Sequence, residues 1–452
     1  MRVAVVGAGP AGVRAVEQLL RAGIAPVWIE EAADGGGRIY QRPPQGFART
    51  HRELYGADAR RALELHAVLD ELKPRTDWRS ETLVWNIRPR DGALDTLTGG
   101  TQRGEVRYDA LILCTGAMDR LVPLPGWTLP GVTTLGGAQI ALKAQGVAIG
   151  ARPVFVGTGP LLWLAALQYA KAGAPPALVL DTTGFATKAA AVAGMLWNLP
   201  TFLRGLRYIA MLRARRIPIA EGAAPLAVEG EGAATALRWR DSAGREHATS
   251  CDAVALGWGL KPEAQLADLA GVPFRFDGTG HNWVPERDSA GRTPVRGIYL
   301  AGDGAAIGGA EVAELSGARA ALALLEDQRI GVDPLLLAHL DRRLRSEARF
   351  RAALERAFPY PAHLARHMPD DTLLCRCEAI TAGELRAAAG DGAPEVNRAK
   401  ALSRVGMGRC QGRVCGPPAA EVLAQALALP IEEVGRLRGQ MPVKPIPVAR
   451  AS

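Results

Sequence analysis

The chain has 452 residues, more than one hydrophobic core usually organises, so we expect two or three domains. Hydrophobic residues make up 48% and charged residues 22%, which are ordinary proportions for a globular protein. The net charge of +8 comes from basic residues interspersed with acidic ones, and aromatic residues are only 5%, so we exclude a nucleic-acid-binding surface. No targeting signal precedes the first predicted strand and no apolar run is long enough to span a membrane, which favours a cytoplasmic protein.

The N-terminal 30 residues carry the pattern of a dinucleotide-binding unit. The predicted order is strand, glycine-rich turn, helix and strand, at residues 3–6, 7–12, 13–22 and 27–30. Gly7 permits the tight turn, Gly9 lets the backbone approach a pyrophosphate, and Gly12 allows the helix to pack closely on the strand. Glu30 ends the second strand, where its carboxylate would accept hydrogen bonds from the ribose hydroxyls.

A distant strand indicates that this first dinucleotide is FAD. Residues 298–303 form an apolar strand that ends in Gly302 and Asp303, and a helix is predicted at 310–325. In flavoproteins with two dinucleotide sites, such an aspartate binds the ribityl and pyrophosphate region, and the next helix N-terminus stabilises the reduced flavin. The other residues that we expect at the FAD site are Pro10, Ala11, Glu31, Gly37, Arg38, Val84, Cys114, Thr115 and Gly116.

A second dinucleotide-like unit begins at residue 153. Gly157 and Gly159 form its turn, and Asp181 ends the following strand as a ribose-binding acid should. However, Leu162 stands where Gly or Ala would let the helix lie close to a dinucleotide. Two interpretations stay open: the site is vestigial, or it binds an adenine nucleotide such as ATP or NAD(P).

These units predict an α/β protein with two nested Rossmann-like domains of the disulfide-reductase-like flavoprotein fold, followed by a small helical C-terminal domain. The expected FAD-binding domain is discontinuous, because its last strand follows the whole second unit. The expected boundaries are 1–125 with 285–330 for the FAD-binding domain, 126–284 for the second nucleotide-binding-like domain, 331–369 for a helical linker, 370–430 for a cysteine-containing domain, and 431–452 for an extended tail.

Four of the six cysteines crowd into the C-terminal region. Cys375 and Cys377 form a CxC pair, and Cys410 and Cys415 form a CxxxxC pair, with 32 residues between the two pairs. Four thiolates suit one zinc ion or a two-iron cluster, but zinc sites more often use CxxC pairs. We favour a [2Fe–2S] cluster, because an electron carrier suits a flavin partner. Cys114 and Cys251, by contrast, stand alone at strand ends, which favours buried structural thiols and argues against disulfide chemistry.

With these motifs in place, the sequence resembles the FAD-containing alpha subunit of heteromeric amino-acid dehydrogenases, which include opine oxidases, hydroxyproline and proline dehydrogenases and the hydrogen cyanide synthase flavoprotein subunit. The segments that carry the resemblance are 5–12, 114–117, 157–164, 299–304 and the cysteine module, which resembles a bacterioferritin-associated-ferredoxin-like [2Fe–2S] domain. The resemblance implies a partner beta subunit similar to D-amino-acid oxidases, which binds the amino or imino acid. It further implies an acceptor such as a quinone and, in some assemblies, a small ferredoxin-like gamma subunit or a further flavin at a subunit interface.

The residues do not nominate a general acid or base, because none of the seven histidines has a recognisable catalytic spacing. This fits an electron relay, whose chemistry belongs to its cofactors. The alternatives are a self-contained NAD(P)H-dependent FAD/[2Fe–2S] reductase and a zinc-stabilised nucleotide-binding scaffold.

Residues 182–218 are apolar and basic, and we interpret them as two helices packed on the second domain. Contact with a partner or with the inner face of a membrane, at most peripheral, is the other interpretation.

Overall fold

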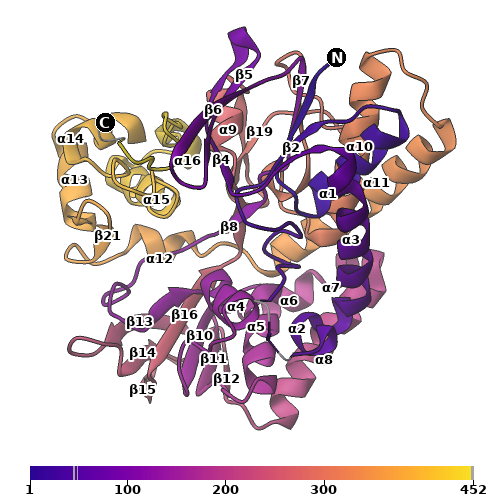
Figure 1. Ribbon diagram of the computed structural model, residues 1–452. Coiled ribbons are helices and arrows are strands. Elements are labelled where there is room, and N and C mark those ends of the chain that lie inside the picture. Colours follow the sequence, from indigo (N-terminus) through magenta and orange to yellow (C-terminus); the bar gives the residue numbers. More distant parts are fainter. Residues whose placement is uncertain (44–45, 48, 449–452) are drawn as a thin grey trace.

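The structure is a computed structural model that describes residues 1–43, 46–47 and 49–448 (Figure 1). Its first sheet has the strand order β20-β7-β1-β2-β3, and every neighbouring pair is parallel. These strands are β1 (Val3–Val6), β2 (Val27–Ile29), β3 (Asp77–Arg79), β7 (Ala110–Leu113) and β20 (Ile298–Leu300). Because β20 pairs with β7, the chain returns to this sheet after a long excursion, as the sequence predicts.

Helices rich in small residues cover this sheet. They are α1 (Pro10–Arg21), α3 (Ala59–Leu72) and α10 (Ala310–Asp327), with α2 (His51–Tyr55) before α3 and α11 (Pro334–Ala357) after α10. A β carbon at Gly317 of α10 would lie 2.0 Å from the carbonyl oxygen of Ala11, so glycine is what lets α1 and α10 touch. A three-stranded antiparallel sheet of β4 (Thr82–Arg88), β5 (Ala93–Thr98) and β6 (Gln102–Arg107) completes this part.

The second sheet repeats the plan with the order β12-β11-β10-β16-β9, again all parallel. Its strands are β9 (Val132–Thr134), β10 (Pro153–Thr158), β11 (Leu178–Asp181), β12 (Ile219–Glu221) and β16 (Ala253–Trp258), flanked by α4 (Leu135–Ala144) and α5 (Pro160–Lys171). An antiparallel meander of β13 (Ala224–Glu229), β14 (Ala236–Arg240) and β15 (Glu246–Ser250) lies before β16. The predicted α/β fold with two Rossmann-like units is therefore confirmed.

Two short antiparallel strands link the sheets, β8 (Ala117–Asp119) and β17 (Leu260–Pro262). After β17 come α9 (Gln265–Leu269) and the hairpin of β18 (Phe274–Asp277) and β19 (Asn282–Pro285). Each linking strand follows the carboxyl end of a sheet strand, so their pairing lies where parallel α/β sheets bind ligands.

The apolar and basic stretch after β11 forms three helices rather than the two predicted. They are α6 (Phe185–Ala190), α7 (Val192–Met195) and α8 (Leu199–Ala214), and the last packs on α5. The side chain of Asn198 caps α8 by accepting a hydrogen bond from the Thr201 N–H at 3.2 Å, and Pro200 occupies its first turn. The cap at Asn198 and the proline that follows it separate α8 from α7.

The C-terminal module, orange to yellow at the left of Figure 1, lies beside the antiparallel sheet of β4, β5 and β6. It contains α12 (Ala362–Arg366), β21 (Leu373–Cys375), β22 (Ile380–Thr381), α13 (Ala382–Gly390), α14 (Val396–Ser403), α15 (Gly416–Leu427) and α16 (Ile431–Val434). The last helix falls where the sequence predicts only an extended tail, and residues 435–448 then form neither helix nor strand. No helix in the described part of the chain is long and apolar enough to cross a membrane.

One continuous hydrophobic core joins the module to the second sheet. It contains Val156 and Trp258 of the sheet together with Leu385 and Val422 of the module, all fully buried. The indole N–H of Trp127 also donates to the Leu373 carbonyl oxygen across the junction, at 2.6 Å. The module is therefore packed onto the nucleotide-binding fold and is not a separate domain joined to it only by a linker.

Candidate functional site

The glycine turn after β1 leaves space that the protein itself does not fill. Gly7 has a φ of +102°, and a β carbon there would lie 2.3 Å from the Cys114 carbonyl oxygen. A β carbon at Gly12 would lie 1.9 Å from the Gly7 oxygen, so both positions require glycine for packing. At Gly9 the nearest atom to a β carbon is the Gly37 Cα at 3.6 Å, an ordinary contact. The opening above Gly9 therefore suits the close approach of a pyrophosphate.

Glu30 lies at the end of β2 with its carboxylate held toward this turn. It accepts hydrogen bonds from the N–H groups of Ala8 at 2.7 Å and Ala32 at 2.9 Å. Burial raises the pKa of Glu30, while these two N–H groups lower it. Its neighbour Glu31 is exposed and forms an ion pair with Lys444 of the C-terminal segment. The fixed carboxylate of Glu30 is where the ribose of a dinucleotide is expected.

Asp303 lies in the short 3-10 turn Gly302–Gly304 that follows β20, before the loop that leads into α10. One carboxylate oxygen accepts from the N–H groups of Gly308 at 2.8 Å and Gly309 at 2.9 Å, so the loop before α10 is tied to it. Gly116 has a φ of +77°, and a β carbon there would meet nothing within 4 Å. The open turn at Gly116 and the N-terminus of α10 fit the flavin end of FAD.

The remaining predicted FAD residues differ in accessibility. Pro10, Ala11, Cys114 and Gly302 are buried, Thr115, Gly37 and Gly116 are partly buried, and Arg38 is exposed. Val84 is 4% exposed and packs in the core around β4, so only its backbone is placed to reach a cofactor. Burial raises the pKa of Cys114 to about 12, as expected for a structural thiol.

The second glycine turn has a different environment. Gly157 packs on β16, where a β carbon would lie 1.6 Å from the Gly257 carbonyl oxygen, and Leu162 is fully buried in the core around α5. Asp181 is also fully buried, accepting from the Thr158 hydroxyl and the Thr183 N–H at 2.9 Å each. Its other oxygen pairs with Lys188 of α6 at 2.6 Å. The carboxylate that would bind a ribose is thus engaged inside the protein, whereas Gly159 remains open.

The four C-terminal cysteines lie close together. Cys415 lies within hydrogen-bond reach of both Cys375 and Cys410, and its single S–H proton can be donated to one of them at a time, while Cys377 lies within reach of Cys410. The bond from Cys415, with backbone N–H groups of residues 406 and 378, lowers the pKa of Cys375 to about 6 against the effect of burial. The pKa of Cys410 falls to about 5 by the same bond from Cys415, again offset by burial and helped by the Gly412 N–H. Cys375 and Cys410 therefore favour the thiolate, the form that binds iron, whereas burial raises the pKa of Cys377 and hydrogen bonding to Cys375 and Cys410 raises the pKa of Cys415.

The ligand types bear on which group the cysteines hold. Four thiolates suit a [2Fe–2S] cluster, which takes two at each iron, whereas zinc sites more often use CxxC pairs than the CxC and CxxxxC spacings of this chain. Lys261 of β17 adds a cation near Cys410 and Cys415 and has no ion pair within the part of the chain that is described. An unpaired cation is what a cluster with net negative charge needs nearby.

An ion pair that sequence patterns did not predict joins the two candidate cofactor sites. Arg413, inside the CxxxxC loop, binds Glu263 through Nε at 2.8 Å and Nη2 at 3.2 Å. The Glu263 N–H donates to the Gly116 carbonyl oxygen at 3.0 Å, and its own carbonyl oxygen accepts from the Thr115 hydroxyl. The cysteine loop is therefore fastened to the turn expected to contact the flavin. Glu263 and Arg413 are separated by 150 positions in the sequence, so no local sequence pattern could predict this contact.

Comparison with known proteins identifies this combination. Residues 1–321 match the family described as pyridine nucleotide-disulphide oxidoreductase, and residues 373–425 match the BFD-like [2Fe-2S] binding domain. The chain is 35% identical to an opine oxidase subunit of Agrobacterium tumefaciens, over 98% of this chain and 90% of that protein. It is 33% identical to hydrogen cyanide synthase subunit HcnB of Pseudomonas aeruginosa, over 99% of this chain and 97% of that protein. The chain belongs to this family of oxidoreductase subunits.

The fold agrees with this membership. The crystal structure of L-proline dehydrogenase from P. horikoshii aligns with a TM-score of 0.73 at 19% identity, over 99% of this chain and 79% of that chain. T. acidophilum thioredoxin reductase aligns with a TM-score of 0.53 at 20% identity, over 72% of this chain and 98% of that chain. The predicted family, the FAD-dependent oxidoreductase class, and the two cofactors FAD and [2Fe–2S] are confirmed.

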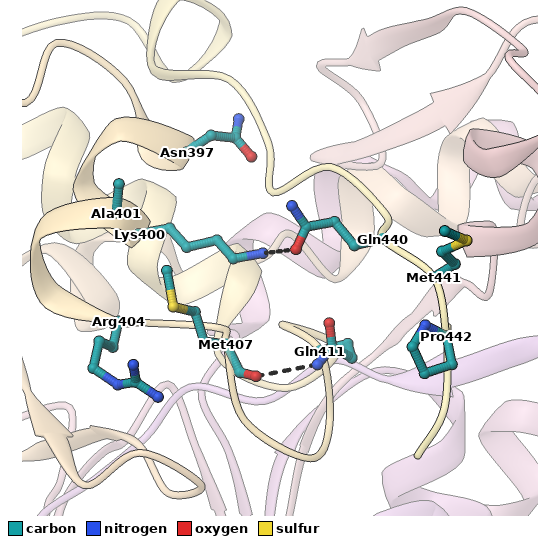
Figure 2. Close-up of a pocket in the computed structure, with 9 residues that line it drawn as sticks. All are labelled: Asn397, Lys400, Ala401, Arg404, Met407, Gln411, Gln440, Met441 and Pro442. Atoms are coloured by element: carbon teal, nitrogen blue, oxygen red, sulfur yellow. Dashed lines mark hydrogen bonds between the residues drawn. The ribbon is translucent and has the colours of Figure 1, made fainter. Parts of the chain in front are cut away.

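A surface cavity of about 490 Å³ opens beside the cysteine loop of this oxidoreductase subunit (Figure 2). Its wall comes from α14, the cysteine loop and the C-terminal segment, through Asn397, Lys400, Ala401, Arg404, Met407, Gln411, Gln440, Met441 and Pro442. Lys400 donates to the Gln440 side-chain oxygen at 3.0 Å, and Gln411 donates to the Met407 carbonyl oxygen at 3.1 Å. The C-terminal segment thus forms one side of this cavity.

Proposed function

We propose that this chain is the electron-transfer subunit of a heteromeric dye- or quinone-linked amino- or imino-acid dehydrogenase of the opine, hydroxyproline or proline type. The observation that carries the proposal is the ion pair of Glu263 and Arg413, which fastens the cysteine loop to the flavin-site turn. Electron carriers must be close and rigidly spaced to exchange electrons efficiently, and this junction supplies both conditions. Relatives that are named as subunits of an oxidase and of a synthase support a multi-subunit enzyme.

In this proposal the present chain does not bind the substrate or determine substrate specificity. A partner resembling a D-amino-acid oxidase binds the amino or imino acid and takes its hydride, and the electrons then pass to this chain. FAD supplies two-electron chemistry and the cluster supplies one-electron chemistry, while the protein groups hold them in place. Glu30 would bind the FAD ribose, Asp303 and the open turn at Gly116 would lie near the flavin, and the four C-terminal cysteines would ligate the cluster. An interfacial flavin, a ferredoxin-like subunit and a quinone acceptor belong to the same proposal.

The alternative is a reductase that takes electrons directly from NAD(P)H. The second glycine turn and Asp181 are its expected cofactor site, but Lys188 and Thr158 already engage that carboxylate. Binding the adenosine ribose of NAD(P) at Asp181 would require breaking a buried ion pair, at a cost of several kcal/mol. This favours the relay over the reductase, and an adenine nucleotide at this turn would be held through its phosphates at the open Gly159 and not through Asp181.

The test uses the full-length chain with and without its partner. The purified chain, loaded with FAD and cluster under anaerobic conditions, should not oxidise proline, hydroxyproline or an opine. NADH should leave its flavin absorbance unchanged. When the chain is co-expressed with an oxidase-like subunit from the same gene neighbourhood, the complex should reduce a dye with one of these substrates. The Cys410→Ser chain in the same complex is the matched control, and it should slow dye reduction while retaining flavin. Turnover of an amino acid by the isolated chain would falsify the relay, and rapid bleaching by NADH would establish the reductase.

A further inference from the structure

The described surface has one concentrated apolar region. Of the fifteen large hydrophobic side chains that are exposed among the described residues, seven lie within 22 residues of sequence on and around α6, α7 and α8. They are Phe185, Val192, Leu196, Trp197, Leu199, Leu203 and Leu206. Single exposed hydrophobic residues are normal on protein surfaces, but a contiguous group marks an interaction site.

The geometry of α8 explains how this region is displayed. Leu199, Leu203 and Leu206 follow the i, i+4, i+7 spacing that places three side chains on one face of a helix. Leu203 is 53% exposed and Leu206 is 47% exposed. Leu212, which lies on the opposite face, is fully buried in the core around α5. The helix is therefore anchored by one face and presents a stripe of leucines on the other.

The segment that carries the stripe has only positive charges. Residues 182–220 contain six basic side chains and no aspartate or glutamate. The helical repeat places Arg207 and Arg213 at the two edges of the leucine stripe, and both are exposed. Arg207 has no ion pair among the described residues, whereas Arg213 pairs with Glu221 at 3.0 Å and stays mostly exposed. An apolar stripe bordered by arginines is the pattern of a helix that lies in the headgroup region of an anionic bilayer.

We propose that α8, with Trp197 beside it, docks this protein on the surface of an anionic lipid bilayer. The leucines enter the boundary between headgroups and acyl chains, and the arginines bind lipid phosphates. Trp197 lies under the guanidinium of Arg349, whose carbon is 4.5 Å from the ring centroid, and it remains 55% exposed, as suits an indole at a membrane interface. Lys188, Arg204 and Arg213 pair with acidic side chains outside the segment, whereas Arg207, Arg215 and Arg216 have no ion pair among the described residues. Anionic lipid phosphates would neutralise these charges, which is why a bilayer is preferred to a protein partner here.

This location would also serve an enzyme that passes electrons to a lipid-soluble acceptor, but the docking does not depend on that role. In Figure 1, α8 lies at the lower right and the cysteine module at the left, so the proposed contact leaves the cavity beside the cysteines uncovered. Failure of the membrane contact would therefore leave the proposed electron relay intact, and the two can be tested separately.

The experiment is co-sedimentation of the purified full-length holoprotein with large vesicles of two compositions. We expect binding to vesicles of phosphatidylcholine mixed with phosphatidylglycerol, weaker binding as salt rises, and at least tenfold weaker binding to phosphatidylcholine alone. The double variant L203Q/L206Q and the variant R207Q should each lose binding about tenfold or more. The matched controls are L402Q on α14 and R245Q in the β14–β15 turn, because both residues are exposed and lie outside the region.

Flavin content and the thermal midpoint should be unchanged in all four proteins, since the substituted side chains are exposed. Absence of binding to the anionic vesicles would overturn the proposal, and so would binding that L203Q/L206Q leaves unchanged. If vesicle binding is absent but L203Q/L206Q abolishes co-purification with an oxidase-like subunit, the face is a protein interface and the membrane assignment is wrong.

Discussion

Replacing Arg413 by methionine should separate the cysteine loop from the flavin-site turn. Arg413 is 8% exposed and its partner Glu263 is 17% exposed, measured on the side chains, so both charges are largely shielded from water. The same guanidinium also donates to the carbonyl oxygen of Val443 in the C-terminal segment. Methionine keeps most of the volume of arginine but leaves the carboxylate of Glu263 buried without a partner.

The expected cost follows from this environment. Removing one partner of a buried ion pair destabilises a protein by about 3–5 kcal/mol. Because Glu263 keeps some access to water, the lower end applies, and we expect the module of R413M to be destabilised by about 3 kcal/mol. Neutralising the stranded carboxylate should restore part of this loss, so the double variant E263Q/R413M should be more stable than R413M alone.

The assay is anaerobic urea unfolding of the loaded protein, followed separately by the visible absorbance of the cluster and the fluorescence of released flavin. R413M should lose its cluster signal at a clearly lower urea concentration than the unsubstituted protein. R376M, which changes an exposed arginine between two of the cysteines, should stay within about 0.5 kcal/mol of it. Equal midpoints for R413M and R376M, with equal iron content, would mean that the ion pair is not a structural connection and would refute the reasoning.

Three further outcomes are expected. G9A should fold but be purified with little FAD, because a β carbon there makes only ordinary contacts with protein atoms and instead enters the pyrophosphate space; a normal flavin-to-protein ratio in G9A would place FAD elsewhere. Cys410→Ser should lose iron and acid-labile sulfide while FAD is retained, and stoichiometric zinc without sulfide in the unsubstituted protein would exclude the cluster. Burial lowers the pKa of Lys143 to about 8, against an ordinary value of 10.5. Below pH 8 the buried amine is charged, which lowers the free energy of unfolding. This loss of stability disappears as the pH rises from 8 toward 10.5. K143M should therefore raise the free energy of unfolding by about 3 kcal/mol at pH 7 and by progressively less above pH 8, and a pH-independent difference would contradict the burial argument.

Local patterns in the sequence predicted the parts of the structure that local physics determines. The glycine turn at residues 7–12 and the alternation of strands and helices are both found. Helix boundaries were predicted less accurately: α1 begins at Pro10, three residues before the predicted start, because proline is well tolerated in the first turn of a helix. The backbone N–H groups of Gly406 and Gly412 do point at cysteine sulfurs, as glycine-rich loops around clusters suggest.

Contacts between distant segments could not be predicted in this way. Lys188 pairs with Asp181 only because α6 folds back over the end of β11, and no repeat or residue spacing in the sequence predicts this ion pair. Likewise, a glutamate after β17 and an arginine in the cysteine loop become partners only through the packing of the module. The sequence-based separation of the cysteine module from the nucleotide-binding fold overlooked the hydrophobic core that they share.

That shared core gives the second Rossmann-like unit a structural role, although the acid of its nucleotide site, Asp181, is bound by Lys188 within the protein. Trp258 and Val156 of the second sheet lie in the same buried core as Leu385 and Val422 of the cysteine module. Unfolding the second unit would therefore expose the base on which the module packs, even if no nucleotide ever binds there. The strand β17, which leaves the second sheet at its carboxyl end, also delivers Glu263 to the junction with the cysteine loop. In this architecture the second unit is retained as the support that holds the cluster at a set position relative to the flavin.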